Sequence, residues 1–176
     1  MIGFAAPMIG LGFGSSGVMD ARTTVGTNRL QLSPAVIMTA YVIEELGLMT
    51  DPSDRDEWPL YSTHLPDNKN VKVNCGAIFD TVGTSDQRSM TGEWPEHPGI
   101  QLRIRARDNA TGYLKIEEVA SALDEVAFGT ITIGALRYRI QNVRRTSPVA
   151  SLGVEPGKRR VNFTVNFLLT IRELTG

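Results

Sequence analysis

The chain has few of the residues that build covalent or metal-based function. Its 176 residues include one cysteine, Cys75, and two histidines, His64 and His97. A single cysteine excludes an internal disulfide, and its place in an alternating apolar run predicts a small buried side chain rather than a nucleophile. Neither histidine has a cysteine or a second histidine at metal-ligand spacing. We therefore predict no metal, no cofactor and no catalytic residue, and interpret the protein as a non-enzyme.

Long apolar runs are also absent. The first 19 residues carry no charge, but Pro7 and five glycines interrupt them. This argues against a membrane-spanning helix, which needs about 20 predominantly apolar residues, and the basic start of a signal peptide is missing. Residues 1–32 are instead expected to form an extended glycine-rich arm, because this composition cannot build a core. The arm would pack either on its own domain or on a neighbouring subunit.

A glycine motif within the arm does not predict a nucleotide site. Gly12–Gly17 has the G-x-G-x-x-G spacing of a dinucleotide-binding loop. That loop requires a strand before it, a helix after it and an acidic residue about 20 positions further on. Pro7 and Gly10 interrupt the strand, and no acidic residue occurs between Asp20 and Glu44. We interpret the match as a coincidence of the glycine content.

Charge of either sign is unevenly distributed. The net charge is −1, but residues 1–98 hold 6 basic and 12 acidic side chains, while residues 99–176 hold 12 and 7. This polarity favours head-to-tail or ring association, unless two faces of one domain differ by chance. The acidic residues 51–57 lack the glycine and the terminal glutamate of a calcium loop. We interpret them as a solvated loop or a charged docking surface.

The remaining patterns predict one α+β domain over residues 33–176. Ser33 followed by Pro34 is a helix start, and apolar residues at helical spacing from Tyr113 to Leu123 predict a second helix. Alternation predicts strands over residues 70–81, 99–107 and 131–133. Short connections favour a two-layer, mainly antiparallel sheet with both helices on one face and an arginine-rich polar face opposite.

A long C-terminal hairpin is the most prominent predicted feature. Leu136–Thr146 and Lys158–Arg172 alternate apolar and polar side chains, which is the period of a half-buried strand. The second run would extend roughly 50 Å at about 3.3 Å per residue, whereas most strands have about 5–6 residues. A strand longer than its domain pairs with or presents something outside it, which indicates an assembly protein.

Charged side chains on the sheet and in the acidic loop are the candidates for a subunit or partner interface. The arginines could contact DNA phosphates, pair with the acidic half of a neighbouring subunit, or remain solvated. No aromatic residues alternate with them, which disfavours a stacking platform for single strands. We favour the pairing between subunits, and expect Arg144–Arg145 and Lys158–Arg160 to cluster at the hairpin end. The candidates are Asp54, Asp56, Glu57, Arg103, Arg105, Arg107, Arg137, Arg139, Arg144, Arg145, Arg159 and Arg160.

Several short phrases follow one another in a recognisable order along residues 33–173. They are a capped helix at Ser33, then Leu65–Asp67, Ile78–Thr81, Pro98–Ala106, the helix Ala110–Leu123, Asn142–Arg145 and Arg160–Thr170. In this order they resemble the tail terminator, or minor capsid, proteins of long-tailed bacteriophages. Residues 1–32 lie outside the resemblance.

The resemblance implies a structural protein of the virion. Such proteins form a ring, usually a hexamer, that ends polymerisation of the tail tube and offers the surface for joining the head. The implied partners are further copies of the chain, the tail tube protein and a neck or head-completion protein. DNA would be a non-specific passing contact, and no membrane would be involved. The implied location is the head-proximal end of the tail, after assembly in the host cytoplasm.

Two other functions remain open from the residues. A neck or head-completion subunit, or the tail tube subunit itself, would also suit an α+β domain with a hairpin and an arm. Open-ended stacking of rings would indicate the tube. A DNA-binding module using Arg103 and Arg105 would instead show DNA affinity that falls steeply with salt.

Overall fold

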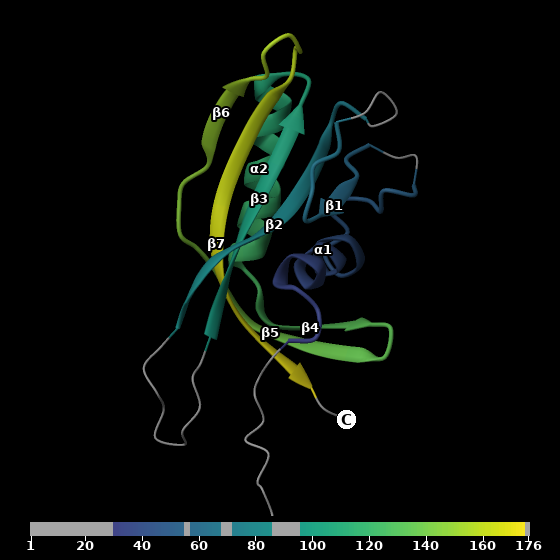
Figure 1. The fold of residues 1–176 in the computed structure, drawn as a ribbon, viewed down its shortest axis with the longest axis vertical. Helices are drawn as coiled ribbons and strands as arrows, with labels where there is room; N and C mark the ends of the chain where they lie inside the picture. Colours follow the sequence, from purple (N-terminus) through teal and green to yellow (C-terminus); the bar gives the residue numbers. More distant parts are fainter. Residues whose placement is uncertain (1–29, 55–56, 68–71, 86–95, 175–176) are drawn as a thin grey trace, which may run out of the picture.

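The computed structural model describes residues 30–54, 57–67, 72–85 and 96–174 (Figure 1). These residues form two helices and one curled, mostly antiparallel sheet, so the predicted α+β class is confirmed. The elements in chain order are α1 (Pro34–Glu44), β1 (Leu60–Ser62), β2 (Cys75–Ser85), β3 (Glu96–Ala106), α2 (Asn109–Asp124), β4 (Ala127–Ile133), β5 (Leu136–Arg145), β6 (Ala150–Val154) and β7 (Val161–Leu174).

Helix α1 begins where its sequence predicts. Ser33 is the N-cap and its hydroxyl accepts a hydrogen bond from the Val36 amide at 3.4 Å, with Pro34 at the first helical position. The Asp80 carboxylate accepts another from the Ala35 amide at 2.8 Å, which ties the helix start to β2. Gly47 follows the helix with φ of 60°, a conformation that glycine adopts without strain.

Helix α2 begins at the N-cap Asp108, whose carboxylate accepts a hydrogen bond from the Thr111 amide at 2.8 Å. Ile116, Val119 and Leu123 are buried against the sheet, as their spacing predicts. Tyr113 recurs at the same helical spacing, but 47% of this residue is exposed. The position that faces the sheet in this turn is the buried Gly112.

The sheet has the strand order β1-β2-β3-β7-β5-β4, and β6 joins β7 on the edge that β5 also uses. Among the strand pairs that the structure describes, β1 with β2 is the parallel one. The central pair is β3 with β7, in which Leu102 lies opposite Val165 and Ile104 opposite Phe163. Figure 1 shows β7 as a long curved strand that links the two ends of the domain.

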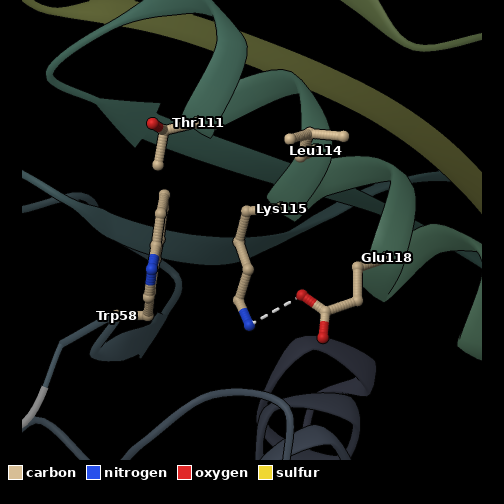
Figure 2. Close-up of a pocket in the computed structure, with 5 residues that line it drawn as sticks. All are labelled: Trp58, Thr111, Leu114, Lys115 and Glu118. Carbon is tan, nitrogen blue, oxygen red and sulfur yellow. Dashed lines mark hydrogen bonds and ion pairs between the residues drawn. The ribbon is translucent and has the colours of Figure 1, made fainter.

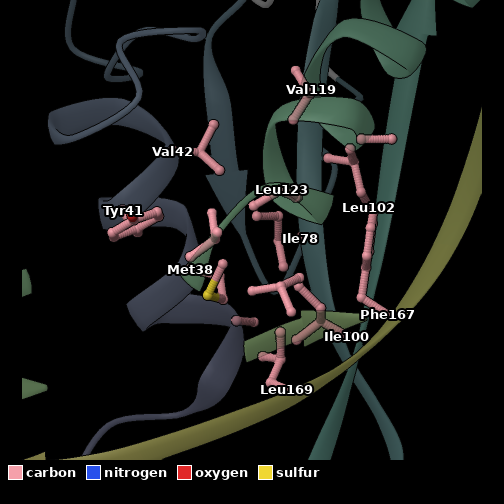
Figure 3. Close-up of a cluster of buried hydrophobic side chains, with 14 of the residues drawn as sticks. Met38, Tyr41, Val42, Ile78, Ile100, Leu102, Val119, Leu123, Phe167 and Leu169 are labelled. Atoms are coloured by element: carbon pink, nitrogen blue, oxygen red, sulfur yellow. The ribbon is translucent and has the colours of Figure 1, made fainter. Parts of the chain in front are cut away.

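A single core fills the space between the helices and one face of the sheet. Met38 and Val42 of α1 meet Ile78 of β2, and Val119 of α2 lies over Leu102 of β3 (Figure 3). Both helices contribute to this one cluster. The apolar side chains that recur at helical and strand spacing in the sequence therefore face this core.

Two short strands lie in segments for which only loops were predicted. β1 falls within Asp51–Leu65, a segment predicted to be a loop, and has three residues, too few to show an alternating pattern. β6 follows Pro148, and all five of its residues are exposed, so it has no apolar period. β6 continues along the edge of β7 beyond β5.

The register of the strands also shows that one predicted cluster of basic residues is wrong. Arg145 lies opposite Phe167, whereas Arg160 immediately precedes Val161 at the start of β7. About seven residues of β7 separate these basic pairs, or roughly 20 Å at about 3.3 Å per residue. Arg144–Arg145 and Lys158–Arg160 therefore do not gather at one hairpin end.

The described part of the predicted arm is residues 30–32, since residues 1–29 and the glycine motif Gly12–Gly17 lie outside the described residues. Gln31 donates to the Glu173 carboxylate from its backbone amide at 3.1 Å and from its side-chain amide at 2.6 Å. Leu30 and Leu32 pack against the core. This end of the arm lies on its own domain, beside the end of β7.

Candidate functional site

Several charged side chains gather at one end of the sheet, where four strands start or stop. β2 begins at Cys75, β3 ends at Ala106, and β7 begins at Val161 next to the end of β6. The register places Cys75 beside Arg105 and Arg105 beside Asn162, all on the face away from the helices. This end lies uppermost in Figure 1, at the turn between β6 and β7. We call it the basic end of the sheet.

Asp67 is the acidic centre of the basic end. Its carboxylate pairs with Lys158, lies 3.0 Å from the Arg160 guanidinium and 4.0 Å from that of Arg105. The hydrogen bond from Lys158 and those from Arg160 hold the pKa of Asp67 below its ordinary value. One loop carboxylate thereby joins β3 to the β6–β7 turn.

Arg105 is a buried charge. Only 1% of it is exposed, and its guanidinium donates to the Pro66 carbonyl at 3.0 Å. Cys75 lies beside it and is buried, as the sequence predicts, and this burial raises the pKa of the thiol. A thiol held protonated is a poor nucleophile, so the contact is structural.

The other candidate residues fall into different environments. The Arg103 guanidinium lies 5.2 Å from the centre of the Phe79 ring, a cation–π contact. Arg145 pairs with Glu117 at 3.1 Å and Asp124 at 2.8 Å, both on α2. Asp56 lies outside the described residues. The remaining candidates with exposed side chains are Arg107, Arg137, Arg139, Arg144, Arg159, Asp54 and Glu57.

The predicted interface candidates do not include the two residues that organise the basic end. Asp67 and Lys158 stand 91 positions apart, and neither belongs to an alternating arginine run. Lys158 is predicted only as part of the basic group Lys158–Arg160, and Asp67 only as part of the Leu65–Asp67 phrase, which the structure brings against Arg105 of Pro98–Ala106. The single arginine face predicted for β3 is divided, with Arg103 over an aromatic ring and Arg105 buried.

Away from the basic end, a hollow lies between α2 and the loop before β1. Trp58, Thr111, Leu114, Lys115 and Glu118 line about 470 Å³ of open space (Figure 2). The Lys115 ammonium lies 5.9 Å from the Trp58 ring centre and 3.0 Å from the Glu118 carboxylate. Because its charges are paired, the hollow presents mainly the faces of Trp58 and Leu114.

The described residues offer little for covalent or metal chemistry. Within them, no three acidic, histidine or cysteine side chains stand close enough to hold a metal ion. Neither described helix has the length and apolar character needed to cross a membrane. The chemistry that the basic end can perform is the binding of anions by guanidinium groups.

Replacing Arg105 tests whether its charge or its bulk supports the fold. We expect Arg105→Ala to lower the free energy of unfolding by about 2–3 kcal/mol, because it empties a buried site and leaves the Pro66 carbonyl without its donor. Arg105→Met keeps the packing and removes a desolvated charge, so its cost should stay under about 1 kcal/mol. Urea denaturation measures both, with the exposed Arg139→Ala as the control. Equal losses for the two Arg105 variants would contradict this view.

No family model matches the chain, and no curated protein matches it. The fold and the surfaces described above therefore carry the argument about function.

Proposed function

We propose that the protein is a structural subunit of a bacteriophage tail, forming a ring that caps the tail tube, ends its growth and presents the surface for joining the head. The observation that carries the proposal is a pair of open edges on one sheet. Among the described residues, β6 pairs only with β7, and β4 pairs only with β5. Open edges are templates for pairing with another chain.

The two edges differ in sequence and carry exposed apolar side chains. On β6, 53% of Leu152 and 65% of Val154 are exposed, and on β4 the figure for Phe128 is 73%. A ring requires a heterologous contact, in which one patch of a subunit meets a different patch of the next. Contact of the β6 edge with the β4 edge of a neighbour would meet this requirement and bury these side chains.

The basic end supports the same function through its stiffness. Loops that bind partners work best when a rigid scaffold presents them. The loop containing Asp67 and the turn containing Lys158 are tied to each other through ion pairs. A ring surface built from these segments would hold its shape for the tube or the neck protein.

The mass of the protein in solution tests the proposal. Light scattering should report a closed oligomer, expected to be a hexamer, either for the protein alone or after it is mixed with purified tail tubes. Val154→Asp places a charge on the β6 edge and should shift the mass to that of one subunit. Val82→Asp makes the same change at a residue that is 95% exposed elsewhere, and should leave the oligomer intact.

The outcomes separate the proposal from its alternatives. A chain that remains monomeric in the presence of tube ends would contradict the ring. Rings that stack without limit would indicate the tube subunit instead of a cap. Equal disruption by both aspartate variants would exclude β6 as the contact edge.

A further inference from the structure

Beside the Asp67 network, and sharing Arg160 with it, the basic end contains a second feature. A surface hollow of about 500 Å³ is lined by Val73, Arg107, Arg159 and Arg160. Three of these four side chains are guanidinium groups, and they arrive from different segments: the end of β3 and the turn before β7. The Arg107 backbone is held in place by a 3.0 Å hydrogen bond from its amide to the Asn74 side-chain oxygen.

The carboxylates near the hollow are already engaged. Both oxygens of Asp67 pair with Lys158 and Arg160, and both oxygens of Asp108 accept from Thr111 at the start of α2. Glu155 lies 4.0 Å from Arg160 and accepts from Asn162. Arg107 and Arg159 form no ion pair with any described residue.

The charge balance at this end is positive. Among the described residues, five cations stand against three carboxylates, which leaves a net charge of +2. The adjoining hollow adds one carboxylate, Glu57, and one ammonium group, Lys72, so it does not change this net charge. The cations are Arg105, Arg107, Lys158, Arg159 and Arg160, and the carboxylates are Asp67, Asp108 and Glu155.

We propose that the hollow between Arg107, Arg159 and Arg160 binds a phosphate group. Guanidinium groups bind phosphate and carboxylate oxygens in pairs. A tetrahedral phosphate offers oxygens in several directions, which suits donors that come from two separate segments. A planar carboxylate presents only two. The source is either free phosphate or the backbone of a nucleic acid. The proposal does not depend on a ring, because one subunit contributes every residue of the hollow.

The test compares two double variants with the same charge change. Arg107→Ala with Arg159→Ala empties the hollow, whereas Arg137→Ala with Arg139→Ala removes two exposed arginines from β5, at the other end of β7. A labelled 20-base-pair duplex of random sequence is titrated by fluorescence anisotropy at several salt concentrations. Pyrophosphate is titrated separately by calorimetry, and the unfolding midpoint of each variant is recorded.

For a nucleic-acid source, the hollow variant should bind the duplex at least about tenfold more weakly. The slope of log K against log salt should fall in magnitude by about 2, since two phosphate contacts are lost. The β5 variant should lose less than about threefold. Arg107→Lys with Arg159→Lys should recover part of the affinity, because lysine keeps the charge but not the paired geometry. For a free-phosphate source, pyrophosphate alone should bind, and only the hollow variant should lose it.

Three results would overturn the assignment. The first is equal loss of binding in the hollow and β5 variants, which would mean diffuse surface charge. The second is poly-glutamate competing as well as the duplex at equal charge concentration, which would make the hollow a carboxylate site. The third is no binding of either phosphate probe by the unaltered protein at low salt.

Discussion

Phe163→Ala is expected to remove about 4 kcal/mol from the free energy of unfolding. Phe163 is 2% exposed and lies at the start of β7, between β3 and β6. Truncating a buried phenylalanine costs about 3–5 kcal/mol, because the lost apolar burial is accompanied by a cavity. A domain of this kind has a total stability of about 5–15 kcal/mol, so this single change would remove a large share of it.

The packing of α2 explains why the cavity left by Phe163→Ala should not be filled. A Cβ placed on Gly112 would come within 2.6 Å of the Phe163 ring, so the absence of a side chain at Gly112 lets the helix approach the strand closely here. The Tyr113 ring lies 6.2 Å from that of Phe163, but it projects to the surface. No side chain of this helical turn is therefore placed to fill the space that alanine would leave.

Guanidinium denaturation at fixed protein concentration measures the effect, since oligomerisation would change the apparent stability. Tyr113→Ala is the matched control: it removes an aromatic ring from the same contact but from the exposed side, and should cost under about 1.5 kcal/mol. If Phe163→Ala lost no more stability than Tyr113→Ala, the close approach of α2 to β7 would not be a main support of the fold.

Gly129→Ala is expected to destabilise the protein by about 2 kcal/mol through a clash with α1. Gly129 lies in β4, and a Cβ there would meet the Tyr41 hydroxyl and lie 2.8 Å from its ring carbon Cζ. Tyr41 is buried on α1. Overpacking a closed contact of this kind costs about 1–3 kcal/mol. The effect measures how tightly α1 is held against the β4 end of the sheet.

A double-mutant cycle isolates the cause. Tyr41→Phe removes the hydroxyl that the new methyl group would meet, so Gly129→Ala with Tyr41→Phe should lose less stability than the sum of the two single changes. We expect a coupling of about 1 kcal/mol, which exceeds the error of additivity for independent sites. Additive losses would mean that alanine destabilises β4 itself rather than its contact with Tyr41.

The basic end changes what the arginines of β3 can do. Arg103 and Arg105 alternate in the sequence as if both belonged to one free surface, yet Arg105 is buried against Pro66 and Arg103 lies over Phe79. Among the described residues of the basic end, Arg107 and Arg159 form no ion pair, and both line the hollow. An anion would therefore bind at the basic end of the sheet rather than on the face that carries Arg103.

The amino-acid sequence by itself determines the local features of this protein. Both helices follow from their caps and from apolar spacing, because capping involves residues within about three positions of each other. The core face of β3 and β7 follows from strict alternation, since successive strand side chains point to opposite faces. The α+β class is then the arrangement that buries these apolar faces against one another.

Only the tertiary structure decides the fate of the charges and of the short strands. Whether Arg105 is buried depends on Pro66, 39 positions away, and the network at Asp67 depends on Lys158, 91 positions away. β6 has no apolar period and exists because the edge of β7 supplies its hydrogen-bond partners. Local pattern cannot encode such contacts, because each depends on where the folded chain brings a distant segment.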